Sequence, residues 1–412
     1  MRKLNVLMIG TGEYTTGYVH TSASQSDKKK GVVALTLFDI RRRGKIGSLS
    51  LVGTTGLKNQ EIRDHLKANI GDVYKNMDVH LDAMFPGDGV DRDLNAFRNA
   101  IDLMNAGDAV TIFTPDDTHY EMALYAIQRK LHVLIAKPAV QLLQHHDHLM
   151  AEAQKNGVLV VVEFHKRFDP IYADARQRIR SLGDFSFFSS YMSQPKTQLQ
   201  TFKHWAGKSS DISFYLNAHH IDLNCWALEG LAVPIKVTAS ASTGLAQQYG
   251  CMEGTEDTIT LMVQWRSIES GNLGTAVYTA SWIASKAEVH SQQRFFYMGH
   301  EGEIRVDQAH RGYEVATDAS GYASVNPLFM RYTPDTNGSY AGQNAYGHQS
   351  IEAWVDACVS VNQDPGRLKQ VEASLPTLSQ TRTVTAILEA GRNSLNANGA
   401  SISIEDTLMH KI

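Results

Sequence analysis

Residues 110–140 constrain the fold of this chain more than any other segment. Two short apolar runs, residues 110–113 and 132–135, predict buried strands, and the spacing of residues 119–129 predicts a helix between them. A strand, helix and strand in this order predict a parallel sheet, whose ligands lie beyond the carboxyl ends of its strands. Lys137 follows the second strand and is therefore a candidate for proton transfer, with a solvated surface lysine as the alternative.

The amino-terminal residues predict a phosphate-binding turn beside this unit. The apolar run at residues 4–9 is followed by Gly10-Thr11-Gly12, and a helix is expected over residues 14–22. Gly10 permits the tight turn, and Gly12 lets the backbone approach a pyrophosphate near Tyr14 and Thr15. The third glycine of G-x-G-x-x-G is displaced, because Thr15 stands at its position. An ordinary strand-to-helix turn therefore remains an alternative.

Residues 32–38 form another apolar run, which we interpret as the second strand of a dinucleotide-binding fold. Asp39 ends this run, where an acidic residue can accept hydrogen bonds from the adenosine ribose and favour NAD. Arg41 and Arg42 follow, and a guanidinium group there can bind a 2′-phosphate and favour NADP. The sequence thus predicts NADPH, NADH or both as cofactor, although a basic turn facing water explains at least one arginine equally well. Residues 44–108, with expected helices at 60–68 and 91–106, are interpreted as a longer connection of unknown role.

The composition is typical of a soluble intracellular enzyme. The 412 residues are 43% hydrophobic, which suffices for two domains with separate cores. The net charge of −4 comes from interspersed charges and argues against a nucleic-acid partner, and no apolar stretch has the length of a membrane span. Cys225, Cys251 and Cys358 lie far apart and support neither a disulfide framework nor a metal site. We therefore expect a cytoplasmic protein without a bound metal.

The second half of the chain predicts a different kind of sheet. Alternating apolar runs occur at residues 185–192, 235–243, 258–265, 276–282, 294–299 and 303–306, which indicates an open, largely antiparallel sheet. The predicted fold class is α/β, with a Rossmann dinucleotide-binding domain over residues 1–140 and an α+β domain over residues 141–412. A helix at about residues 370–396 is expected to pack back towards the first domain.

Taken together, the motifs resemble those of the glucose–fructose oxidoreductase, inositol dehydrogenase and MocA family (Gfo/Idh/MocA). The similar motifs, in the family's order, are Thr114-Pro115 with His119, the HVLIAKP segment that ends in Lys137-Pro138, R-F-x-P from Arg167 to Pro170, H-x-x-D from His219 to Asp222, and G-x-x-G-x-I from Gly299 to Ile304. The resemblance covers nearly the whole chain. It implies that Thr114, Pro115, His119 and Pro138 help to bind a dinucleotide.

The resemblance also assigns catalytic roles. It implies that Lys137 is the general acid for reduction, with hydride passing between nicotinamide C4 and a sugar carbon. Ala136 replaces the glutamate of the family's E-K-P motif. His219 matches the histidine of a D-x-x-x-H pair, but Tyr215 replaces its aspartate. Either Tyr215 as a proton donor or Asn217 as an orienting residue would then assist Lys137.

The expected substrate site combines aromatic faces with cations, a set that fits a hexuronate. Its candidate residues are His165, Lys166, Arg167, Lys203, His204, Trp205, Asn217, His220 and Trp282. The FDIRRRGK segment and the GTTG that follows it resemble fungal D-galacturonate reductases of the same family, which form L-galactonate. The alternatives are a neutral aldose or inositol dehydrogenase, an NAD-dependent glycosidase and a non-catalytic dinucleotide-sensing regulator. The resemblance and the open sheet also predict a homo-oligomer, either a dimer or a tetramer.

Overall fold

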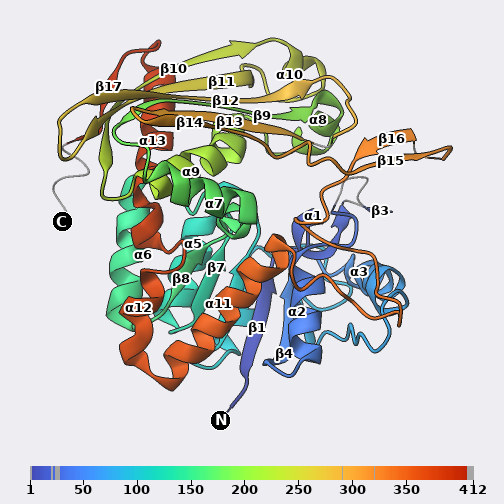
Figure 1. Ribbon diagram of the computed structural model, residues 1–412. Coiled ribbons are helices and arrows are strands. Elements are labelled where there is room, and N and C mark those ends of the chain that lie inside the picture. The colour runs from blue at the N-terminus through green and yellow to red at the C-terminus, as the bar shows by residue number, and fades with distance from the viewer. Residues whose placement is uncertain (1, 20–21, 24–27, 290, 320, 406–412) are drawn as a thin grey trace.

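The computed structural model describes residues 2–19, 22–23, 28–289, 291–319 and 321–405, which form two layers, each built around a β-sheet. Figure 1 shows the smaller sheet with its helices below, and the larger sheet above it. This arrangement confirms the predicted fold class. Among the described residues, no helix is long and apolar enough to cross a membrane.

The first sheet is entirely parallel and has the strand order of a Rossmann fold, β5-β4-β1-β6-β7-β8. Its strands are β1 (Leu4–Ile9), β4 (Ile46–Val52), β5 (Ala83–Phe85), β6 (Ala109–Ile112), β7 (His132–Ile135) and β8 (Val160–Val162). After β1 the chain adds β4 and β5 on one side, and then returns to add β6, β7 and β8 on the other. The crevice at the carboxyl ends of β1 and β6 is therefore the expected ligand position.

The helices of this layer are α1 (Glu13–Thr16), α2 (Val33–Arg42), α3 (Asn59–Leu66), α4 (Ala96–Asp102), α5 (His119–Gln128) and α6 (Leu143–Asn156). The predicted helix over residues 14–22 is wrong in length, because α1 ends at Thr16 and an insertion with β2 (Tyr18–Val19) and β3 (Ser22–Ala23) follows. Gly17 and Gly31 have φ angles of 78° and 70°, and their backbones approach so closely that a Cβ on either would clash. These two glycines let the insertion leave the connection between β1 and β4 and rejoin it at the same point.

The prediction of a strand at residues 32–38 is wrong. Residues 33–38 belong to α2, with Val32 as its N-cap, and every side chain from Val33 to Ile40 is buried. A short, continuously apolar run fits a buried helix as well as a buried strand, and periodicity alone does not separate them. The second strand is β4, within the segment interpreted as a connection.

The second sheet is mixed and has the order β14-β13-β9-β12-β11-β10-β17. Its strands are β9 (Phe185–Pro195), β10 (Ala232–Thr243), β11 (Glu256–Ser267), β12 (Leu273–Ala284), β13 (Gln292–Gly299), β14 (Gly302–Asp307) and β17 (Ile402–Ser403). Only the β9–β12 pair is parallel among these neighbours, and the six strands predicted from alternation are confirmed. In β11, for example, Ile259, Leu261 and Val263 are buried, whereas Met262 is half-exposed on the opposite face.

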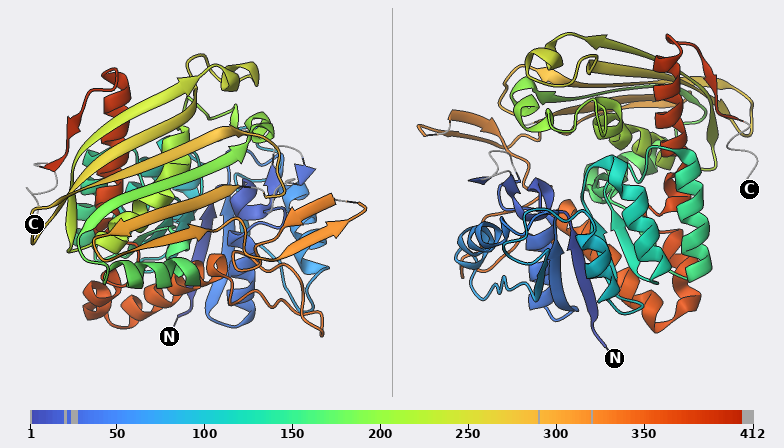
Figure 2. Two further views of the ribbon diagram at one scale, coloured as in Figure 1. Left: turned by 45° about the horizontal axis from the view of Figure 1, so that its top comes forward. Right: turned by 180° about the vertical axis from the view of Figure 1, so that it is seen from behind.

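The inner face of this sheet is covered by α7 (Pro170–Ile179), α9 (Ala218–Leu228) and α13 (Leu378–Asn396), whereas no helix of the described residues covers its outer face (Figures 1 and 2). The remaining elements are α8 (Leu199–Phe202), α10 (Leu245–Gln248), α11 (Tyr346–Gln363), α12 (Leu368–Glu372) and the projecting hairpin of β15 (Glu314–Thr317) and β16 (Gly321–Ser324). α11 packs on α2 and β7, and α13 packs on α6. Because β8 belongs to the first sheet, the predicted boundary at residue 140 falls inside that layer.

Candidate active site

A cavity of about 500 Å³ opens at the carboxyl ends of the parallel strands, where the two layers meet. The side chains and turns that line it come from both layers. They include Gly10, Thr11, Gly12, Glu13, Tyr14, Lys28, Gly53, Thr54, Thr114, Pro115, Asp116, Lys137, Glu163, His165, Phe202, His204, Trp205, Ser210 and Tyr215. The cavity thus joins the predicted phosphate turn to the predicted catalytic lysine.

The turn after β1 fits a dinucleotide phosphate. Gly10 has a φ of 104°, and a Cβ there would clash with the carbonyl oxygen of Phe113. A Cβ on Gly12 would meet nothing within 4 Å, so the backbone at the start of α1 is open to a ligand. The Thr16 hydroxyl donates to the Thr11 carbonyl at 2.9 Å and closes the turn from behind. Thr15 is buried and does not line the cavity. The prediction that its side chain contacts the cofactor is therefore wrong.

The turn after β6 forms the next wall. Thr114 and Pro115 line the cavity, as predicted. His119 is fully buried behind them, and its ring nitrogens lie 3.0 Å from the carbonyl oxygens of Thr114 and Pro138. His119 therefore ties these two turns together, and neither it nor Pro138 lines the cavity.

Lys137 projects from the end of β7 into the cavity. Its ammonium donates to the carbonyl oxygen of Tyr215 and lies 4.4 Å from the centre of the Tyr215 ring. Burial lowers the pKa of Lys137 to about 8; the charge of Asp116 opposes this change and the charge of Lys28 adds to it. The lysine can therefore gain and lose a proton near neutral pH.

Two imidazoles lie beside this lysine. The Nδ1 of His165 lies 3.3 Å from the Tyr14 hydroxyl, and the His165 and His219 rings are 5.3 Å apart. Burial and nearby lysine charges lower the pKa of both rings well below 6.5, so both are neutral at physiological pH. The Nδ1 of His219 is buried without a hydrogen-bond partner among the described residues. Catalytic roles for His219 and Tyr215 stay predictions.

Several predicted substrate residues lie elsewhere. Arg167 forms a buried, two-pronged ion pair with Asp222 at 2.7 and 2.9 Å, and Lys166 donates to Gln293 and Gln308. Both cations thus bind protein side chains beneath the second sheet. The prediction that they line the cavity is wrong. Lys203 does not line it either.

Three further predictions are corrected in the same way. The Asn217 amide donates to Ser213 at 3.0 Å, His220 pairs with the Tyr172 hydroxyl at 2.9 Å, and Trp282 donates to the Glu256 carbonyl at 2.7 Å. All three are fully buried and outside the cavity. Trp282 instead supports Trp205 from behind, with ring centres 5.9 Å apart.

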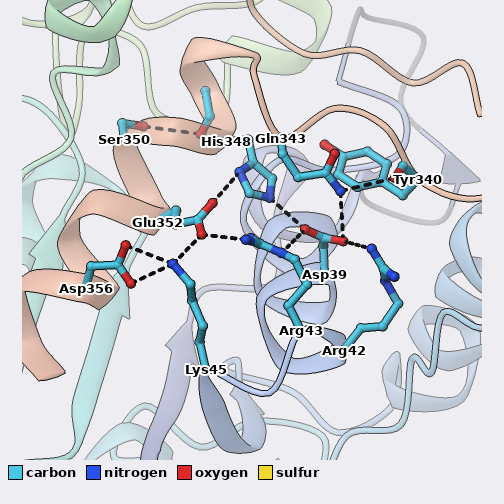
Figure 3. Close-up of polar contacts among 11 residues, drawn as sticks. Asp39, Arg42, Arg43, Lys45, Tyr340, Gln343, His348, Ser350, Glu352 and Asp356 are labelled. Carbon is cyan, nitrogen blue, oxygen red and sulfur yellow. Dashed lines mark hydrogen bonds and ion pairs between the residues drawn. The ribbon is translucent and has the colours of Figure 1, made fainter.

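Asp39 and the arginines after it are also misassigned. Figure 3 shows Asp39, on α2, surrounded by Arg42, Arg43, Gln343 and His348. Burial alone would raise the pKa of Asp39, but hydrogen bonds from His348 and Arg42 and the charge of Arg43 lower it to about 2. Arg41 donates to the carbonyls of Asp78 and His80. Since these side chains join structural elements outside the cavity, they do not bind the ribose or its phosphate as predicted.

Several cavity residues were not predicted from the sequence, among them Thr54, Asp116, Glu163 and Lys28. Thr54 follows β4, so it takes the position that was assigned to Asp39. Asp116 accepts a hydrogen bond from Ser210, and Glu163 accepts one from Ser350 at 2.7 Å. Burial raises the pKa of both carboxyls, and that of Glu163 reaches about 7. Glu163 directly follows β8, so the rule that ligands lie beyond strand ends could have found it. Lys28 lies on an insertion that gave no such signal.

A Rossmann sheet, an open glycine turn and a lysine with a lowered pKa in one cavity define a nicotinamide dinucleotide-dependent oxidoreductase. Residues 4–164 match the family model described as "Oxidoreductase family, NAD-binding Rossmann fold". This part of the chain is thus similar to the NAD-binding Rossmann domain of that oxidoreductase family.

Known relatives cover different shares of the chain. The scyllo-inositol 2-dehydrogenase (NAD(+)) of Bacillus subtilis (strain 168) is 38% identical over 72 residues, which are 18% of this chain and 21% of that protein. The scyllo-inositol 2-dehydrogenase (NADP(+)) IolW of the same strain is 23% identical over 321 residues, 73% of this chain and 84% of that protein. The scyllo-inositol dehydrogenase of Lactobacillus casei, solved with NAD(H) and scyllo-inositol, has a TM-score of 0.65 at 16% identity and covers 98% of this chain and 100% of its own. This last likeness shows the shared fold.

Proposed function

We propose that this protein reduces the aldehyde of a sugar acid with NADPH or NADH, and that D-galacturonate, which would yield L-galactonate, is the substrate to test first. The observation that carries the proposal is one cavity in which Lys137 faces the dinucleotide turn. The bound nicotinamide would supply the hydride. Lys137 would donate the proton to the carbonyl oxygen, as a general acid with a pKa near the working pH does.

The cavity wall supports a sugar-like substrate. Phe202, Trp205 and Tyr215 contact one another with ring centres 5.0 to 5.3 Å apart, and all three line the cavity. Aromatic faces pack against the C–H groups of a sugar, and His204 and Ser210 offer polar atoms at the same wall. The cations Lys28 and Lys137 favour an acidic sugar over a neutral one.

The ribose end of the cavity supports a preference for NADPH. NAD-selective Rossmann folds place a carboxylate after the second strand, where it accepts from the 2′-hydroxyl and repels a 2′-phosphate. Here β4 is followed by Gly53-Thr54-Thr55-Gly56, and Gly53 and Thr54 line the cavity. A carboxylate is thus missing from this segment.

A second candidate is oxidation of an inositol ring. It is favoured by the relatives, because two of them are named scyllo-inositol 2-dehydrogenases. The same Lys137 would then accept the hydroxyl proton as a general base.

The deciding experiment compares kcat/KM for D-galacturonate, D-galactose and scyllo-inositol with both cofactors, by following the absorbance of the reduced nicotinamide. We expect kcat/KM for galacturonate to exceed that for galactose by about 10- to 100-fold, the value of a hydrogen bond to a charged group. Equal or faster use of galactose would support a neutral aldose dehydrogenase, and faster oxidation of scyllo-inositol would support the second candidate. A glycosidase or a regulator would give no steady change in absorbance.

A further inference from the structure

One cavity cation, Lys28, comes from the insertion that interrupts the first crossover. α1 and α2 would otherwise be parts of one helical connection between β1 and β4, and the close pair Gly17 and Gly31 closes the neck of the insertion. A Rossmann crossover needs no such excursion to join its strands. The described end of the insertion nevertheless brings Lys28 to the wall of the cavity.

Lys28 lies at the imidazole side of the cavity. Its ammonium is 5.9 Å from the centre of the Phe329 ring, and Phe329 lies 5.2 Å from the ring of His165. His165 in turn lies beside His219. Lys28 is therefore near the groups that surround Lys137 at the reacting end of the cavity.

The charge of Lys28 acts on this whole group. It is among the causes that lower the pKa of Lys137, His165 and Lys166. The carboxyls of Asp116 and Glu163 also line the cavity, but burial raises the pKa of both, and each accepts a hydrogen bond from a serine. Glu13 is the third carboxylate, at the start of α1. An anionic ligand at the imidazole side would relieve the repulsion among these cations.

We propose that Lys28 binds the carboxylate of the substrate and so sets the preference for an acidic sugar. The proposal rests on the proposed function, in which the aldehyde end of the sugar faces Lys137. A carboxylate and a cofactor phosphate share the chemistry that a lysine recognises, namely anionic oxygen atoms. The test must therefore separate these two sources.

The test compares Lys28→Met with Lys29→Met, which removes the same charge from the exposed neighbouring side chain. For each variant we would measure kcat/KM for D-galacturonate and D-galactose, and the Kd of NADPH without sugar. We expect Lys28→Met to lower the galacturonate-to-galactose ratio of kcat/KM by about 10- to 100-fold, mostly through KM. The Kd of NADPH should change much less, and Lys29→Met should match the wild type.

A second readout is the pH profile. Removal of the Lys28 charge should raise the apparent pKa of Lys137, so the alkaline limb of the reduction rate should move to higher pH. Lys28→Gln, which keeps a polar side chain, provides the same comparison if the methionine variant does not fold.

Each outcome is informative. If the galacturonate preference persists in both Lys28 variants, the role of Lys28 is refuted while the proposed function stands. If the Kd of NADPH rises as much as the galacturonate ratio falls, Lys28 binds a cofactor phosphate instead. If the wild-type enzyme has no preference for galacturonate over galactose, both proposals are refuted.

Discussion

Lys137 obtains its chemistry from its surroundings. The family's motifs have a glutamate before this lysine and an aspartate four residues before the histidine, but this chain has Ala136 and Tyr215 there. Asp116, from the neighbouring strand end, supplies a carboxylate whose charge acts on Lys137. Because burial outweighs this stabilisation, the pKa falls to about 8, and both protonation states are populated near neutral pH.

Replacement of Lys137 by alanine should lower the rate of aldehyde reduction by about 10²- to 10⁴-fold, as removal of a general acid does. Reduction needs the protonated amine, so wild-type kcat/KM should fall as the pH rises through about 8, and the reverse oxidation should rise. This limb should be absent from the variant. NADPH binding should persist, which fluorescence titration would check. An active variant with an unchanged pH profile would exclude Lys137 from proton transfer.

At the scale of elements, residues 33–42 form helix α2 and not the predicted second strand. The strand end that we propose to distinguish NAD from NADP is therefore the end of β4. Residues 32–38 are so uniformly apolar that they fit a buried strand, but they form a helix whose faces are all covered. β4 has a weaker signal, because its sequence IGSLSLV includes a glycine and two serines. The strand next to β1 is therefore β4, and Thr54 lines the cavity just after it, where our proposal puts the adenosine ribose.

A carboxylate introduced at Thr54 should shift the choice of cofactor towards NADH. We expect Thr54→Asp to lower the NADPH-to-NADH ratio of kcat/KM by about 10- to 100-fold, since it repels the 2′-phosphate and accepts from the 2′-hydroxyl. Arg41→Ala is the control, because Arg41 binds the carbonyls of Asp78 and His80. If Arg41→Ala changes the NADPH-to-NADH ratio of kcat/KM and Thr54→Asp does not, the arginines after Asp39 bind the 2′-phosphate, as the sequence predicted.

At the scale of the whole molecule, the end of the chain completes the first layer. α11 lies against α2 and carries His348 and Glu352 of the ion-pair network around Asp39 (Figure 3). The same helix reaches the cavity, where Tyr346 stacks on His165 with ring centres 5.7 Å apart and Ser350 donates to Glu163. Residues far apart in the sequence therefore hold the walls of one site.

Asp39→Asn should destabilise the protein without changing its choice of cofactor. Removal of one charge from a buried ion pair costs about 3–5 kcal/mol. We expect the lower end of this range, because His348 is fully buried but Arg42 and Arg43 reach solvent. The folded-state pKa of Asp39, about 2, lies below its ordinary value of 3.8, so this stability should be present above pH 3.8 and lost as the pH falls towards 2. Urea unfolding at neutral pH would measure the loss. Arg178→Ala, which breaks the exposed pair with Asp174, should change the free energy of unfolding by less than about 1 kcal/mol.

The sequence by itself determined the features that depend on neighbouring residues. These are the strands β1 and β7, the glycine turn, the position of Lys137 at a strand end, and the alternating strands of the second sheet. Each follows from local periodicity and from the conformational freedom of glycine, which act over a few residues.

Only the tertiary structure decided which charged side chains reach the cavity. The sequence predicted Lys166 and Arg167, like Lys137, to reach the cavity. Instead, Lys166 binds Gln293 and Gln308, and Arg167 binds Asp222, all from distant segments. Asp39 lies on α2 and pairs with His348 outside the cavity, whereas Lys28, on an insertion, lines the cavity. The physical reason is that a buried charge must find its partner in space, and that partner is often far away along the chain.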